Sequence, residues 1–176
     1  MDELISVRKI GRMEILNAVK INQIIKRMSF EILERNYDSK TIYLAGINNN
    51  GYLFAKILLK ELTKISDKQI ELVRIKLNPA NPIDQDVNIE LIGDVKKTNP
   101  IIIIDDVANT GRTLFYSFKP FLAELYKKIE VAVLVDRKHK SFPVKVDYLG
   151  ISLATTLKEE IKVDLDKVRE RKVELV

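Results

Sequence analysis

Four consecutive isoleucines run directly into two aspartates and a turn of small residues. The segment reads Ile101-Ile102-Ile103-Ile104-Asp105-Asp106-Val107-Ala108-Asn109-Thr110-Gly111-Arg112-Thr113-Leu114. A continuous apolar run that stops at turn residues is typical of a strand buried on both faces, as in a parallel sheet. The segment therefore predicts a strand, a tight turn and the start of a helix, with both carboxylates at the strand's carboxyl end.

The turn after this strand has the chemistry of a phosphate site. Residues 109–113 would place backbone N–H groups and the hydroxyls of Thr110 and Thr113 at a helix N-terminus, where unpaired donors and the macrodipole favour an anion. Asp105 and Asp106 would repel that phosphate, so we expect them to bind sugar hydroxyls or a divalent cation beside it. A diol next to a phosphate indicates ribose 5-phosphate. An ordinary buried strand with a helix cap would explain the isoleucines but not the paired acids.

Composition narrows the possible chemistry. A chain of 176 residues with 46% hydrophobic content can bury one sizeable core, so we expect a single domain over 1–176. It has no cysteine and one histidine, which excludes a disulfide framework, a thiol nucleophile and a metal site of several imidazoles. It also has no Gly-Lys-Ser/Thr run of a Walker A loop. With neither a signal-like N-terminus nor an apolar run near ~20 residues, we expect a cytoplasmic protein without membrane association.

Strand-like and helix-like segments alternate along the chain, which predicts an α/β fold with a mostly parallel sheet between helices. We expect helices at 11–36, 52–65 and 111–127. We expect strands at 41–45, 70–77, 101–104, 131–135, 146–149 and 161–165. Residues 78–100 are the least regular, and the tail 164–176 fits an edge strand, a helix or a dimer contact equally well. Ligands of such sheets bind at the carboxyl ends of the strands, here at loops 46–51, 105–113 and 136–141.

The acidic pair followed by Thr-Gly-Arg-Thr resembles the 5-phosphoribosyl-1-diphosphate (PRPP) motif of type I phosphoribosyltransferases. The resemblance implies that family's fold, with a central, mostly parallel sheet, flanking helices and a small hood formed mainly by about 136–160. It also implies transfer of phosphoribose from PRPP to a nucleobase, with Mg²⁺ as cofactor and pyrophosphate as leaving group.

The family motif assigns provisional roles to residues of this chain. The catalytic residues would be Asp105 and Asp106, which would also contact the ribose and are candidate Mg²⁺ ligands, although the metal would be held mainly through PRPP. The remaining ribose and 5-phosphate contacts would come from Val107, Ala108, Asn109, Thr110, Gly111, Arg112 and Thr113. The pyrophosphate loop would consist of Ile47, Asn48, Asn49, Asn50 and Gly51. The base and hood residues would be Asp136, Arg137, Asp147 and Tyr148.

Within the family, the C-terminal third resembles the PyrR branch, bacterial regulators of pyrimidine operons that also have uracil phosphoribosyltransferase activity. The likeness rests on residues 131–140 and 143–150, and on the helix end at 34–36. It implies uracil as the base, a nucleoside monophosphate as product, nucleotide salvage as the role, and a homodimer or higher homo-oligomer. Asn109 agrees with a pyrimidine, because the 6-oxopurine branch usually has an aspartate there.

Two departures from the family pattern leave alternatives open. Asn50 stands where the family often has a basic residue, and residues 76–82 contain no arginine where the PyrR-type flexible loop has one. Either change would weaken transition-state stabilisation. A weak or silent PRPP- or nucleotide-sensing protein is therefore one alternative. An RNA-binding regulator is the other, suggested by Arg137, Lys138, Lys140 and Lys145.

Overall fold

A computed structural model of the chain describes residues 12–82, 88–91, 95–154 and 159–176. Their secondary structure, in chain order, is β1 (Met13–Leu16), α1 (Ala18–Arg35), β2 (Thr41–Ile47), α2 (Asn50–Ile65), β3 (Gln69–Lys76), β4 (Asn88–Leu91), β5 (Pro100–Ala108), α3 (Arg112–Ser117), the 3₁₀ helix η1 (Lys119–Phe121), β6 (Lys128–Arg137), β7 (Tyr148–Leu153), β8 (Ile161–Asp164) and β9 (Lys172–Leu175). Among these elements, no helix is both long and apolar enough to cross a membrane.

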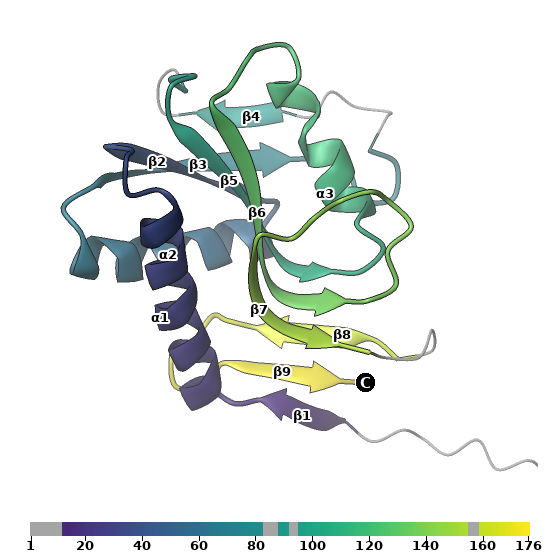
Figure 1. Ribbon diagram of the computed structural model, residues 1–176. Helices are drawn as coiled ribbons and strands as arrows, with labels where there is room; N and C mark the ends of the chain where they lie inside the picture. The colour runs from purple at the N-terminus through teal and green to yellow at the C-terminus, as the bar shows by residue number, and fades with distance from the viewer. Residues whose placement is uncertain (1–11, 83–87, 92–94, 155–158) are drawn as a thin grey trace, which may run out of the picture.

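The larger sheet has the strand order β4-β3-β2-β5-β6-β7. Strands β2, β3, β5, β6 and β7 run parallel, and β4 pairs antiparallel with β3 at one edge. Helices α1 and α2 cover one face, and α3 lies on the other (Figure 1). The predicted α/β class with a mostly parallel sheet is confirmed.

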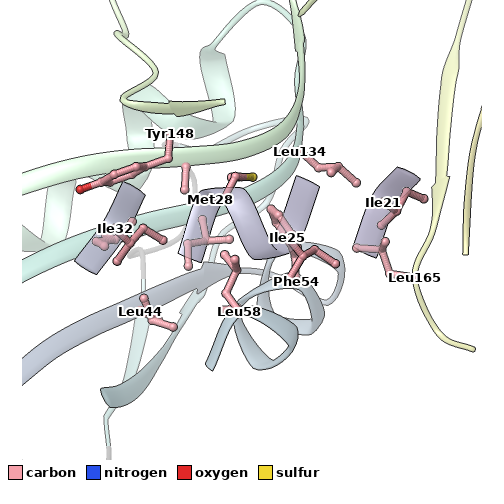
Figure 2. Close-up of a cluster of buried hydrophobic side chains, with 14 of the residues drawn as sticks. Ile21, Ile25, Met28, Ile32, Leu44, Phe54, Leu58, Leu134, Tyr148 and Leu165 are labelled. Carbon is pink, nitrogen blue, oxygen red and sulfur yellow. The ribbon is translucent and has the colours of Figure 1, made fainter. Parts of the chain in front are cut away.

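Strand β5 is buried from both sides. Ile102 and Ile104 pack in a cluster with the apolar faces of α1 and α2, whereas Ile101 and Ile103 pack in a second cluster with Leu114. Figure 2 shows the first cluster, in which side chains of α1 pack together with those of α2 and of strands β2, β6 and β7. Alternate residues of a strand point to opposite faces, so a strand with helices on both sides must be apolar at every position.

A second, smaller sheet has the order β1-β9-β8, with antiparallel pairs throughout. It is attached to α1 through Leu165, which packs near Ile21 (Figure 2), and through Arg171. The Arg171 guanidinium donates to Asn22 Oδ1 at 2.7 Å and to the Leu165 carbonyl at 3.3 Å. Strands β8 and β9 are close in sequence, whereas β1 lies more than 140 residues before them.

Part of the range 136–160, where a hood is expected, belongs to the large sheet, because β7 pairs in parallel with β6 and forms an edge of that sheet. Arg27 of α1 reinforces this placement by donating to the carbonyls of Leu149 and Gly150, each at 2.8 Å. The segment at 155–158 lies outside the described residues.

Three other element boundaries differ from expectation. The helix predicted at 11–36 is β1 followed by α1, because Asn17 has extended dihedrals and caps α1 by accepting from the Lys20 N–H at 3.0 Å. The helix predicted at 111–127 stops at Ser117 and continues only as η1, which contains a proline that lacks an N–H donor. The open alternatives for the tail resolve to β9, which is the central strand of the small sheet.

A buried polar network links α1 to the far end of the sheet. The Tyr148 hydroxyl donates to Glu130 Oε2 at 2.8 Å, and Asn36 Nδ2 donates to that hydroxyl at 2.9 Å and to Glu130 at 3.1 Å. Burial, followed by the hydrogen bond to Glu130, raises the pKa of Tyr148 far above its ordinary value. Lys128 pairs with the other oxygen of Glu130 at 3.0 Å. Each buried group therefore has a partner, as a buried network requires.

Replacing Tyr148 with Phe should destabilise the protein, because a buried carboxylate loses a donor and Asn36 loses an acceptor. We expect the free energy of unfolding to fall by about 2 kcal/mol. The midpoint of thermal unfolding should fall by roughly 6 °C for a chain of this size. Tyr37→Phe is the matched control, since Tyr37 is 80% exposed. Equal midpoints for the two variants would show that the network adds nothing to stability.

Candidate active site at the carboxyl edge of the sheet

Three loops meet where β2, β5 and β6 end. The last residues of these strands are Ile47, Ala108 and Arg137. In the paired register, Gly46 lies beside Ile104, and Ala108 lies beside Asp136. Because parallel strands end at the same edge, the three loops predicted from the sequence converge there, as ligand-binding loops of open α/β sheets do.

The acidic pair lies inside β5, not after it. Asp105 Oδ1 accepts from the backbone N–H of Asp106 at 3.0 Å, and Asp106 Oδ2 accepts from Asn50 Nδ2 at 3.0 Å. Desolvation by burial, with the negative charge of Asp106 as the next cause, raises the pKa of Asp105 well above its ordinary value. The site thus holds two partly buried carboxyl groups side by side, which favours hydroxyl donors or a cation as ligands.

The turn after β5 encloses a pocket of about 50 Å³. Its lining consists of Asp105, Val107, Ala108, Asn109, Thr110, Gly111, Arg112, Thr113 and Leu114. Gly111 has a φ of +83°, a left-handed conformation that side chains with Cβ rarely adopt. This is the segment predicted to hold a phosphate, and the pocket has the size of a single small group.

The loop after β2 forms a second pocket, of about 290 Å³, on the other side of the acidic pair. Its lining consists of Ile47, Asn48, Asn49, Asn50, Pro79, Asp105, Asp106 and Thr113. Asn48 has a φ of +51° and is held to the end of β3, since its side chain accepts from the Leu77 N–H at 3.1 Å. Gly51 allows α2 to approach β5, because a Cβ there would lie 2.4 Å from the Ile104 carbonyl oxygen.

A third pocket, of about 510 Å³, lies between the acidic pair and the small sheet. On the large-sheet side it is lined by Asn50, Leu53 and Asp106. On the other side it is lined by Arg12, Glu160, Ile161, Lys162, Val163, Asp164, Leu165, Asp166, Lys172 and Glu174. The sequence did not identify this wall, because it depends on pairing between β1 and β9. The only local signal was the apolar alternation at 161–165.

Asp136 and Arg137 lie beside the phosphate turn and help to hold it. Arg137 donates to Asn109 Oδ1 at 3.3 Å. Lys140 donates to the Asp136 carboxylate and also to the carbonyls of Ala108 and Asn109, each at 3.2 Å. Lys140 is a supporting residue that the sequence analysis did not assign to the site.

Asp147 and Tyr148 lie elsewhere. Both are at the amino end of β7, where Asp147 accepts from the Val131 N–H at 3.1 Å and Tyr148 belongs to the buried network. In the β6–β7 register, Tyr148 lies beside Ala132, whereas Leu153 lies beside Arg137 at the site edge. The structure therefore does not bring these two residues to the acidic pair. Both residues stand at the start of β7, whereas the acidic pair lies toward the carboxyl ends of the strands.

The donor set suits a metal that arrives with its ligand. Among the described residues, no cluster of three or more His, Cys, Asp or Glu side chains could enclose a metal ion. Asp105 and Asp106 offer two adjacent carboxylates at the junction of the pockets. Mg²⁺ is often bound by one or two carboxylates together with substrate phosphates, so the residues fit it in that mode.

Solved structures with the same fold are phosphoribosyltransferases. The hypoxanthine phosphoribosyltransferase of Trypanosoma cruzi superposes with a TM-score of 0.72 at 15% identity, over 92% of this chain and 94% of that one. A hypoxanthine-guanine phosphoribosyltransferase from Bacillus anthracis gives 0.66 at 15% identity, over 80% of this chain and 82% of that one. At identities this low, the superpositions establish the fold alone, and they confirm the expected type I architecture.

Curated relatives share more of the sequence. The bifunctional protein PyrR of Streptococcus gordonii is 31% identical over 155 residues, covering 86% of this chain and 90% of the relative. Its counterpart from Streptococcus sanguinis is 30% identical over 156 residues, with the same coverage. These matches confirm the resemblance to PyrR, and the model of the phosphoribosyl transferase domain matches residues 11–172. The chain belongs to the phosphoribosyltransferase family.

Proposed function

We propose that this protein transfers phosphoribose from PRPP to a nucleobase, with uracil as the favoured base, and releases pyrophosphate. The observation that carries the proposal is that three pockets meet at the acidic pair. Asp105 lines both the pocket of the phosphate turn (109–113) and the pocket of the asparagine-rich loop (47–51). Asp106 lines this second pocket and also the third pocket, which lies between the acidic pair and the small sheet. A ribose bound at the pair would direct its 5-phosphate, pyrophosphate and incoming base into separate pockets.

The proposed reaction is a displacement at the anomeric carbon of the ribose. A ring nitrogen of the base forms the new bond to that carbon and releases its proton to water. The bond to the pyrophosphate oxygen breaks, pyrophosphate leaves with that electron pair, and the sugar acquires oxocarbenium character in the transition state. Asp105 and Asp106 would bind the ribose hydroxyls and place negative charge near the developing cation. The turn 109–113 would hold the 5-phosphate and so align the sugar with the base. No covalent intermediate with the protein is required.

Mg²⁺ would be held mainly by oxygens of PRPP, with Asp105 and Asp106 as candidate protein ligands. When bound, it would neutralise charge on the leaving pyrophosphate. Asp106 of the acidic pair accepts from the Asn50 amide at 3.0 Å. This contact orients Asp106 and links the two sides of the site.

Uracil is favoured by two observations. Relatives named PyrR match at about 30% identity over most of the chain, whereas the hypoxanthine and hypoxanthine-guanine phosphoribosyltransferase structures match only in fold. Asn109 has no carboxylate that could exchange a proton with N7 of a purine, and its side-chain oxygen accepts from Arg137. The product would be a nucleoside monophosphate, formed in nucleotide salvage.

The second candidate is a nucleotide sensor with little or no transferase activity. It is favoured by Asn50, whose amide donates to Asp106 and has no positive charge that could neutralise pyrophosphate. A regulator that binds RNA is less well supported, because Arg137 and Lys140 turn toward the phosphate turn instead of forming an open basic surface. Self-association into a homo-oligomer remains part of the proposal, supported by exposed Phe115 and Leu122 beside an apolar pocket of about 460 Å³.

A turnover assay tests the proposed function. PRPP and Mg²⁺ would be offered with uracil, hypoxanthine, guanine, adenine or orotate, and both nucleotide and pyrophosphate would be followed. We expect uracil to give its nucleotide and pyrophosphate in equal amounts. Turnover of a purine alone would correct the base. PRPP binding without any turnover would favour the sensor, and absence of both would contradict the proposal.

Asp105→Asn should bind PRPP weakly yet give a more stable protein. Loss of charge-assisted hydrogen bonds to the ribose should weaken PRPP binding by about a hundredfold, as seen by calorimetry. Without ligand or Mg²⁺, Asn removes a buried charge, so the free energy of unfolding at pH 8 should rise by about 1 kcal/mol. Asp105→Asn combined with Asp106→Asn should bind still more weakly and remain folded.

The stability gain should depend on pH. The folded state holds the Asp105 proton more tightly than the unfolded chain, so wild-type stability falls as pH rises from about 4 through the raised pKa of the folded state. The Asn variant lacks this loss, and its advantage should therefore shrink toward pH 4. Asp67→Asn, on an exposed loop, is the matched control and should change neither property. Unchanged PRPP affinity in the folded Asp105→Asn protein would remove the acidic pair from the proposal.

A further inference from the structure

The asparagine-rich loop lacks the charge that its proposed ligand needs. Asn48, Asn49 and Asn50 line the pocket assigned to pyrophosphate, and none of them is basic. One amide hydrogen of Asn50 is already donated to Asp106. How this loop would bind pyrophosphate depends on the proposed function, on which the role of the residues described next also rests.

A cation reaches the loop from the neighbouring strand. Arg74 of β3 lies beside Gly46 in the parallel register, one residue before the end of β2. Its guanidinium donates to Asn49 Oδ1 and lies over the ring of Tyr52, with its central carbon 5.1 Å from the ring centroid. Stacking on Tyr52 restricts the guanidinium to the position from which it contacts the loop.

Another donor of the Arg74 guanidinium is unsatisfied. Its Nε is buried and has no hydrogen-bond partner among the described residues. A second cation, Lys56, lies over the same Tyr52 ring, with its Nζ 4.7 Å from the centroid. Leaving a buried donor unpaired beside another positive charge is unfavourable, and such groups call for an explanation in function.

The contact with Asn49 has a definite chemical consequence. A guanidinium has only donors, so it can bind Asn49 through the carboxamide oxygen and never through the nitrogen. The NH₂ group of Asn49 is thereby left as a donor, on a residue that lines the pocket. Without Arg74 the amide could turn and present its oxygen, which would repel an anion.

We propose that Arg74 is a positioning residue for pyrophosphate, which fixes Asn49 as a donor and places positive charge behind the loop. It thereby offsets the missing basic side chain at Asn50. A charged donor on the amide oxygen also polarises the carboxamide, so its N–H groups become better donors to an anion. The segment 76–82, which has no arginine, need not be the source of the charge.

Binding of three ligands separates this role from a structural one. Calorimetry in Mg²⁺ buffer would compare PRPP, pyrophosphate and ribose 5-phosphate with the wild type, Arg74→Met, Arg74→Lys and Asn49→Ala. Arg74→Met should weaken PRPP and pyrophosphate binding by about tenfold and leave ribose 5-phosphate binding unchanged. Arg74→Lys keeps the charge without the planar fork and should show a smaller loss. Lys60→Met is the control, since it removes one charge from an exposed position of α2.

The double variant tests the coupling. If Arg74 acts through Asn49, adding Asn49→Ala to Arg74→Met should cause little further loss of pyrophosphate affinity. Wild-type affinities in Arg74→Met, an equal loss for ribose 5-phosphate, or fully additive losses would overturn the inference and leave the proposed function standing. A wild-type protein that binds neither ribose 5-phosphate nor PRPP would overturn both. If Arg74→Met fails to fold, Arg74→Lys and Asn49→Ala decide the same question.

Discussion

Burial of β5 on both faces is the constraint on which the site depends. Its isoleucines divide between two clusters, one under α1 and α2 and the other under α3, so the strand cannot shift or rotate without exposing apolar surface on one face. The two carboxylates that follow are therefore held at a fixed position along β5, near its carboxyl end. Strands β2 and β6 pair with β5 on either side, and the loops that leave them are positioned relative to the same two acids.

The sequence predicted the parts of this arrangement that depend on local patterns. The apolar run 101–104 and the turn 109–113 belong to one short segment, and the structure places the run in the buried part of β5 and the turn after its carboxyl end, as expected. The sequence did not predict the pocket wall formed by the small sheet, because neither segment alone indicates that β1 pairs with β9. The misplacement of Asp147 and Tyr148 has a related cause, since the start of β7 is set by its register with β6. Arg74 was missed because an arginine within a strand pattern does not indicate which loop it will reach.

The site combines groups that each oppose stability. Desolvation and the charge of Asp106 disfavour ionisation of Asp105, and Arg74 holds a buried donor without a partner. Elsewhere in the described structure, buried polar groups such as Asn36 and Glu130 are fully paired. Strain confined to one edge of a well-packed sheet is what a binding site for a highly charged ligand requires, because the ligand then satisfies groups that the protein alone leaves unsatisfied.

The small sheet also has a consequence for how the protein is made. Met13 of β1 pairs with Leu175 of β9, so β1 has no partner strand until β9, about 160 residues later, has left the ribosome. At ordinary rates of synthesis this interval is on the order of ten seconds. The large sheet can form in the meantime from strands that lie closer in sequence. The pocket between the acidic pair and the small sheet would therefore close last, so that a nascent chain could acquire its phosphate turn well before it acquires the wall opposite.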